Sequence, residues 1–368
     1  MQSIVGDQVA RVALAVLVFH SSHSAAWTAA AYAVTFLPGL AGAVTGRLAD
    51  LASRRDVMVT CDLVRAGLLA VAALSGTPPW AVCALVAGSV VVSGPFQAAS
   101  TAVIADLFDG DPYRRAVGLR QSAGQLAQLA GFALGGVIVA ASGARAGLWV
   151  DAATFAVSAA ALQVGLPRSA ATARSTVDRS VIHGLRLVAR DRSQRRRLLL
   201  IGLVGFWIVP EGLAAPYAAH VGSGAVGVGV LLSALPLGFA VNSWVLTRYV
   251  GSHRATRLEI PLAICAGVPL IPCVLAPPIA VAALLWLSCG AATAYLSLTL
   301  AAYIAAAPDD RRGQAAGLSS AAGLLAQGVG VVSGGLIASA TSPGTAVALA
   351  GLAGVCCATT IAARLHTG

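Results

Sequence analysis

The sequence contains no lysine, a single asparagine at Asn242, and only 10% charged residues among its 368. A soluble domain carries about 25% charged residues, so this chain is not an ordinary soluble enzyme. The 58% share of hydrophobic residues excludes a disordered chain as well. A mean hydropathy of +0.83 is instead typical of a helical protein that crosses the membrane many times.

Cysteine pairs with metal-binding or redox spacing are also missing. The seven cysteines form no C-x-x-C motif, and each lies in or beside an apolar stretch. We interpret them as small packing residues, because zinc or redox chemistry needs paired spacings. His20 and His23 have no carboxylate–histidine cluster near them. We therefore predict no metal site and no bound cofactor, and no paired catalytic set indicates an enzyme.

What the chain does have is a series of twelve apolar stretches. A transmembrane helix needs about 20 apolar residues, and a membrane barrel would show alternating segments of about ten. These runs are continuous and of helical length, so the sequence predicts an all-α membrane protein with twelve transmembrane helices. The first run lacks a basic lead segment and is predicted as an uncleaved helix. The runs lie at about 4–20, 25–46, 57–75, 79–104, 117–141, 146–165, 198–220, 225–247, 257–276, 279–306, 315–340 and 344–363.

Arginine is distributed unevenly between the loops. The loops after even-numbered spans, together with the first residues of the spans that follow them, hold twenty arginines, whereas the loops after odd-numbered spans hold only Arg145. The positive-inside rule therefore predicts that both termini face the cytoplasm. The longest basic loop, 167–197, also has apolar residues spaced for one helical face. We interpret it as a linker on the anionic membrane surface, in preference to a nucleic-acid patch.

This linker separates two halves that repeat one another. Residues 118–138 align with 317–337, with eleven of 21 positions identical. We predict a six-helix bundle at 1–166 and a second at 198–368, typical of transporters built from parallel repeats. In both repeated spans two glycines are four residues apart, a spacing that lets helices approach closely in lipid. These predicted packing glycines are Gly131, Gly135, Gly330 and Gly334.

Acidic residues inside apolar spans are the candidates for chemistry, because an ionisable group at membrane depth is a functional hypothesis by default. Glu211 lies about thirteen residues into the seventh span, between Pro210 and Pro216. The prolines kink the helix and free backbone carbonyls. Burial favours the protonated carboxyl, as proton coupling requires. The alternative is a structural acid paired with an arginine or a backbone amide.

Three other acids in the predicted spans are assigned roles. Asp7 and Arg11 are one helical turn apart in the first span and can pair, either as a fixed contact or as a proton-gated switch. Asp62 and Arg65 are predicted to form a structural pair. Asp151, placed near the outer end of the sixth span, where water is close, is predicted to orient its helix.

The loop after the second span resembles a signature of the major facilitator superfamily. It reads Gly46-Arg-Leu-Ala-Asp50-Leu-Ala-Ser-Arg54-Arg55, and the signature is G-x-x-x-D-[RK]-x-G-[RK]-[RK]. Gly46, Asp50, Arg54 and Arg55 match, while Leu51 and Ser53 depart from it. The resemblance implies that the matching residues help to latch the cytoplasmic side during alternating access.

Other segments resemble actinobacterial members of an exporter branch that includes siderophore and macrolide efflux proteins. They are Gly6-Asp7-Gln-Val-Ala-Arg11, Phe36-Leu-Pro38, Asp151-Ala-Ala-Thr-Phe155 and Pro210-Glu211-Gly-Leu-Ala-Ala-Pro216-Tyr217. Gly131-Phe-Ala-Leu-Gly135-Gly136 is similar to the antiporter signature G-P-x-x-G-G, with Phe132 in place of proline. The resemblance implies a proton-coupled exporter of small hydrophobic, drug-like or secondary-metabolite molecules. We expect it to act as a monomer in the bacterial cytoplasmic membrane, with the proton gradient as its energy source.

In this family the fourth, seventh and tenth spans line the central cavity. The resemblance therefore makes Phe96, Gln97, Trp207 and Tyr295 candidates for contact with substrate, although each aromatic could equally pack within the protein. Two alternatives to a coupled exporter remain open. One is an uncoupled facilitator or an importer, and the other is a non-transporting membrane sensor built on a transporter fold.

Overall fold

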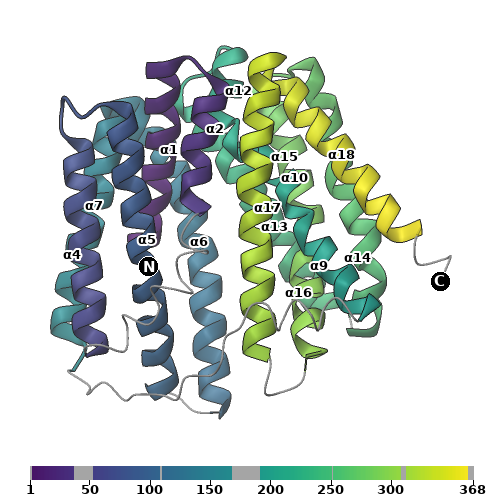
Figure 1. The fold of residues 1–368 in the computed structure, drawn as a ribbon, viewed down its shortest axis with the longest axis horizontal. Coiled ribbons are helices and arrows are strands. Elements are labelled where there is room, and N and C mark those ends of the chain that lie inside the picture. The colour runs from purple at the N-terminus through teal and green to yellow at the C-terminus, as the bar shows by residue number, and fades with distance from the viewer. Residues whose placement is uncertain are drawn as a thin grey trace. The chain divides into compact units, whose positions relative to one another are not determined.

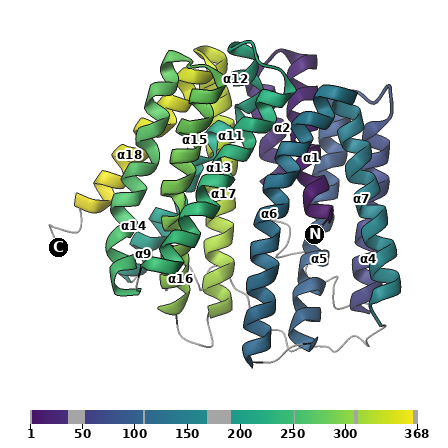
Figure 2. The ribbon, with the colours of Figure 1, turned by 180° about the vertical axis from the view of Figure 1, so that it is seen from behind.

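The computed structural model describes residues 2–36, 53–107, 110–167, 191–250, 252–307 and 312–363, and this part of the chain contains helices and no strand. Figures 1 and 2 show the helices from two opposite sides. The N-terminal half has α1 (Gln2–Ser22), α2 (Ala25–Ala33), the 3-10 helix η1 (Val34–Phe36), α4 (Arg54–Ala73), α5 (Pro79–Leu107), α6 (Gly110–Ser142) and α7 (Ala144–Gly165). The C-terminal half has α9 (Arg192–Gly202), α10 (Val204–Trp207), α11 (Val209–Gly212), α12 (Ala214–His220), α13 (Ala225–Tyr249), α14 (Ser252–Gly267), η3 (Val268–Leu275), α15 (Ile279–Thr293), α16 (Tyr295–Ala305), α17 (Arg312–Ala340) and α18 (Pro343–Ala363).

The predicted spans coincide with these helices. Among the described residues, nine helices are long and apolar enough to cross a membrane, or ten when the bent pair Arg192–Gly212 and Ala214–His220 is included. The third predicted span is α4, which carries five charged side chains and so falls outside this count. The second begins with α2, and its predicted remainder at 37–46 lies outside the described residues. The prediction of an all-α membrane protein is confirmed.

Local sequence explains where several helices begin and end. Ser53 caps α4, because its hydroxyl accepts the N–H of Asp56. Asp191 caps α9 in the same way, accepting the N–H groups of Ser193 and Gln194. Gly143 joins α6 to α7 with a φ of 83°, a conformation that glycine adopts without a steric penalty.

The seventh predicted span is not one continuous helix. It is divided into α9, α10, α11 and α12, with a bend of 43° between Gly212 and Ala214. Pro210 and Pro216 cannot donate backbone hydrogen bonds. Glu211 N–H donates to Ile208 O at 3.0 Å, three residues earlier in the chain, which forms a tighter turn than the four-residue spacing of an α-helix. Glu211 therefore lies on a short helical segment, directly before the bend of the span.

Contacts divide the described residues into two units. Unit 1 comprises 2–23, 34–36, 53–107, 110–167 and 224–233, and unit 2 comprises 24–33, 191–223, 234–250, 252–307 and 312–363. Within unit 1, α4 packs on α5 and α7, and α1 packs on α6 and α7. Within unit 2, α17 packs on α2 and α10, and α18 packs on α14 and η3.

The repeated glycines lie at close helix contacts in both units. A Cβ built at Gly131 would lie 2.6 Å from the backbone oxygen of Val5 on α1, and one at Gly135 would lie 3.0 Å from Val9 Cα. In unit 2, a Cβ at Gly330 would collide with the backbone of Gly205 on α10, and one at Gly334 would lie 2.5 Å from Val209. The fifth span thus packs on the first as the eleventh packs on the seventh.

Because of this packing, we expect Gly328 and Gly330 of α17 to respond differently to substitution by alanine. Gly328→Ala adds a methyl group with nothing within 4 Å, so we expect it to be neutral or to stabilise by up to about 1 kcal/mol through helix propensity. Gly330→Ala forces α17 away from α10 and should destabilise by about 1–3 kcal/mol. Thermal unfolding of the two detergent-solubilised variants compares them directly, and equal melting temperatures would contradict the packing role.

Candidate functional site

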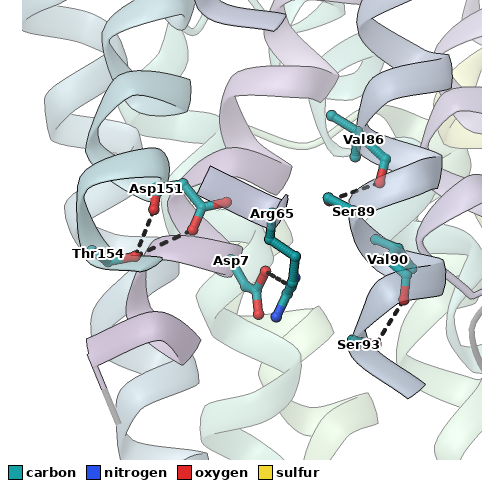
Figure 3. Close-up of polar contacts among 8 residues, drawn as sticks. All are labelled: Asp7, Arg65, Val86, Ser89, Val90, Ser93, Asp151 and Thr154. Atoms are coloured by element: carbon teal, nitrogen blue, oxygen red, sulfur yellow. Dashed lines mark hydrogen bonds and ion pairs between the residues drawn. The ribbon is translucent and has the colours of Figure 1, made fainter. Parts of the chain in front are cut away.

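An arginine and three acids gather inside unit 1, on helices α1, α4 and α7. Figure 3 shows Arg65 of α4 beside Asp7 of α1, with Nη2 and Oδ1 2.8 Å apart. The Arg65 guanidinium also lies over the ring of Phe155 on α7, 3.9 Å from its centroid. Arg65 is buried, whereas the Asp7 side chain keeps 34% exposure. One guanidinium thus joins three helices through an ion pair and a cation–π contact.

Asp151 of α7 lies next to this ion pair and is only 1% exposed. Thr154 Oγ1 donates to the Asp151 carbonyl at 2.8 Å and lies 3.4 Å from its Oδ1 (Figure 3). Asp7, Arg65 and Arg11 are all within electrostatic reach of the Asp151 carboxyl. The close approach of α1 explains the burial, because any side chain at Gly6 would collide with Asp151 and Thr154.

Asp62 completes the cluster and is fully buried. The Ser158 hydroxyl is near, but neither carboxyl oxygen accepts a well-formed hydrogen bond from a described residue. Ser89 and Ser93 of the neighbouring α5 donate within their own helix, to Val86 O and Val90 O (Figure 3). A buried carboxyl without a partner is costly when ionised, so Asp62 is the least compensated acid of the cluster.

Three expectations about these residues are wrong. Asp7 pairs with Arg65 of α4 in the described structure and not with Arg11, and Asp62 does not take Arg65 as an ion-pair partner. Asp151 is not near water but is covered by α1 and α4. In each case the deciding neighbour lies on another helix, so spacing along one helix could not identify it.

Glu211 occupies a separate site within unit 2. It lies on α11, is 7% exposed, and accepts a hydrogen bond from the hydroxyl of Tyr32 on α2 at 2.7 Å. A phenol donates to a carboxylate and to the carbonyl oxygen of a carboxylic acid alike. This contact is therefore compatible with both protonation states of Glu211.

Trp207 and Tyr295 lie together near the same broken span. Trp207 Nε1 donates to Tyr295 Oη at 3.1 Å, and the Tyr295 hydroxyl donates to Leu200 O at 2.9 Å. Both side chains are buried, and Gly267 and Gly354 pack directly against the Trp207 ring. Their polar atoms are satisfied within unit 2, and their contact with substrate stays a prediction.

Phe96 and Gln97 lie on α5, in unit 1. Phe96 packs against Met58 and Ala99, and Gln97 Oε1 accepts a hydrogen bond from Arg120 Nη2 at 2.6 Å. The Gln97 amide is therefore engaged with a cation of α6, and its contact with substrate stays a prediction.

The arginines of the signature loop hold neighbouring helices of unit 1 together. Arg54 pairs with Asp106 and donates to Ala102 O at 3.1 Å, both on α5. Arg55 donates to Gln163 O at 3.4 Å, on α7. Gly46 and Asp50 lie outside the described residues, as does most of the linker, 168–190.

One buried acid, Glu259 of α14, is not among the residues predicted from the sequence. It has no exposed surface, and its Oε2 lies 3.4 Å from Arg196 Nη2 on α9. Its other oxygen has no hydrogen-bond partner among the described residues. The signal was available, because Glu259 is an acid at the start of an apolar run. No group of three acidic, histidine or cysteine side chains in the described part could hold a metal ion.

The chain matches the Major Facilitator Superfamily over residues 3–330. It belongs to that superfamily. No curated protein matches the chain. Among solved structures, it is similar to a bacterial homolog of the human lysosomal transporter Spinster in an inward-facing, occupied conformation, with a TM-score of 0.77, 14% identity, and coverage of 98% of this chain and 93% of that one.

Two further solved structures share the fold at low identity. A POT family transporter in complex with 5-aminolevulinic acid has a TM-score of 0.73 and 11% identity, covering 98% of this chain and 94% of that chain. The nucleoside transporter NupG has a TM-score of 0.72 and 15% identity, with coverage of 99% and 97%. This member of the major facilitator superfamily is therefore a multi-pass membrane transporter and not an enzyme.

Proposed function

We propose that the protein is a proton-coupled exporter of small, moderately hydrophobic molecules, drug-like compounds or secondary metabolites. The observation that carries the proposal is Glu211, a buried carboxyl on a broken transmembrane helix that accepts a hydrogen bond from Tyr32. A carboxyl in low dielectric exchanges its proton when its surroundings change. Alternating access supplies such a change, because the site faces the two sides of the membrane in turn.

The direction of transport is inferred from sequence. The segment from Gly131 to Gly136 is similar to the antiporter signature, and other segments resemble the siderophore and macrolide efflux branch. The substrates named for the solved neighbours, 5-aminolevulinic acid and nucleosides, belong to those proteins.

We also propose that the transporter acts as a monomer in the bacterial cytoplasmic membrane, with both termini in the cytoplasm. The arginine distribution supports this orientation, since twenty arginines lie in or directly beside the loops on one side and one lies on the other. The signature loop would then latch the cytoplasmic side, with Arg54 and Arg55 anchoring α4 to α5 and α7.

Reconstituted vesicles test the proposal. Purified transporter is placed in liposomes loaded with a panel of macrolides and other hydrophobic compounds, and the outside is acidified. For one proton per substrate, one pH unit should sustain a substrate ratio of about tenfold, and a protonophore should abolish it. Equilibration that ignores the pH gradient would indicate an uncoupled facilitator. Absence of flux for the whole panel would favour a sensor.

A further inference from the structure

A groove of 1210 Å³ opens within unit 2 between α9, α10 and the C-terminal half of α18. In Figures 1 and 2, α18 leans away from α17 toward its C-terminal end. One end of the groove carries Arg192, Arg195 and Arg196. Most of the remaining lining is apolar and includes Leu199, Leu203, Phe206, Cys356, Cys357 and Ile361.

The length of the groove matches one leaflet of a bilayer. Arg192 and Phe206 are separated by fourteen residues of nearly continuous helix, which rise about 21 Å at 1.5 Å per residue. Half of a bilayer, with its headgroup region, is also about 21 Å thick. Because α9 begins at Arg192, the basic end lies at the membrane–water boundary and the apolar end at the depth of the acyl chains.

Two guanidiniums at the basic end are available to a ligand. Arg196 is engaged with Glu259, whereas Arg192 and Arg195 are exposed and form no ion pair with a described acid. The nearby Asp191 carboxylate accepts the N–H groups of Ser193 and Gln194 on its Oδ1, and its single negative charge is outnumbered by the two arginines. Among the described residues, the groove therefore presents net positive charge beside an apolar channel.

The apolar wall needs no polar partner. Cys356 and Cys357 are exposed on α18, and the hydroxyl of Thr360, the polar side chain beside them, already donates to Cys356 O at 2.7 Å. A hydrocarbon chain can therefore fill this wall without leaving a buried hydrogen-bonding group unsatisfied.

We propose that this groove binds an anionic phospholipid. Its phosphate is held by Arg192 and Arg195, and one acyl chain lies between α9–α10 and α18. Guanidinium groups bind phosphate through paired N–H donors. A second copy of this chain, with its net charge of +10, would bring further positive charge to the groove, so charge complementarity favours the lipid. The proposal does not depend on the direction or coupling of transport.

Native mass spectrometry of the full-length protein with dioleoyl-phosphatidylglycerol or dioleoyl-phosphatidylcholine tests this site. We expect the protein to retain the anionic phosphatidylglycerol in preference to phosphatidylcholine. The double variant Arg192→Gln, Arg195→Gln should weaken the retention of phosphatidylglycerol on the order of tenfold or more, at about 1 kcal/mol per arginine. Arg257→Gln is the matched control, because Arg257 is an exposed arginine at the start of another span that does not line the groove. Its lipid retention should equal that of the unmodified protein.

A second experiment probes the apolar wall with the charges intact. Cys357→Trp should fill the groove and abolish preferential retention, and bound phosphatidylglycerol should protect Cys357 from alkylation by N-ethylmaleimide. Equal retention of both lipids, or retention unchanged in the arginine variant, would overturn the proposal. So would protection by glycerol 3-phosphate alone, which would indicate a site for soluble phosphate, or a dimer mass that disappears in the Cys357→Trp variant.

Discussion

A glutamine in place of Glu211 should abolish accumulation against a gradient while downhill substrate exchange continues. Glutamine mimics the permanently protonated acid, so the carrier can still reorient with substrate but cannot release a proton. Its amide oxygen can accept the Tyr32 hydrogen bond that Glu211 accepts at 2.7 Å, so the packing of α2 on α11 should survive. The measurement compares gradient-driven efflux with counterflow of labelled substrate in the same vesicles.

Glu259 offers the matched control for this experiment. It is also a buried acid of unit 2, but its carboxylate lies 3.4 Å from the Arg196 guanidinium. Neutralising it leaves a guanidinium without its partner, which should lower protein abundance and every mode of transport together. A Glu211→Gln variant that behaves like Glu259→Gln would show that Glu211 is a structural partner.

Unimpaired gradient-driven efflux by a well-expressed Glu211→Gln variant would reject the coupling role altogether. The next candidate for proton coupling would then be Asp7 of unit 1, whose side chain is 34% exposed beside the buried Arg65. Arg11 reaches the same cluster through Asp151. The coupling candidates therefore lie in two units, and the same pair of flux measurements distinguishes them.

The positions of the spans could be predicted because they depend on local quantities. Length, hydropathy and the prolines and glycines between runs are properties of consecutive residues. The sequence repeat at an offset of 199 residues also corresponds to equivalent helix contacts in the structure. Gly136 packs on Gly229 of α13, and Gly335, its repeat, packs on Ala29 of α2. Close contact between two helix backbones requires small residues at the crossing, so these contacts could be predicted from the glycine spacing.

The partners of the buried charges could not be predicted in the same way. Asp7 and Arg65 are 58 residues apart, and Tyr32 and Glu211 are 179 apart. Spacing of three or four residues identifies neighbours on one helix only. The choice of Arg65 between Asp62 and Asp7 depends on how α4 rotates against α1, and that rotation is fixed by the packing of whole helices.

Arg65 should be the most sensitive position of unit 1, and Arg65→Met should unfold the transporter in the membrane or prevent its accumulation. The substitution removes the ion pair with Asp7 and the cation–π contact with Phe155. It also leaves Asp62 and Asp151 buried without their central cation. Breaking one side of a buried charge network costs about 3–5 kcal/mol, which is a large part of the stability of most proteins.

A rescue experiment separates charge from packing at this position. If the loss arises from uncompensated carboxylates, adding Asp62→Asn and Asp151→Asn to Arg65→Met should restore most of the abundance and melting temperature, because methionine retains much of the arginine volume. Arg257→Met, at an exposed position, serves as the control and should change stability by less than about 0.5 kcal/mol. Failure of the triple variant to recover would instead assign the loss to the interactions that it still lacks, namely the ion pair with Asp7, the contact with Phe155 and the packing of the guanidinium between α1, α4 and α7. The role of Arg65 would then be to hold the three helices together, because Asp62 and Asp151 would not need its charge to remain buried.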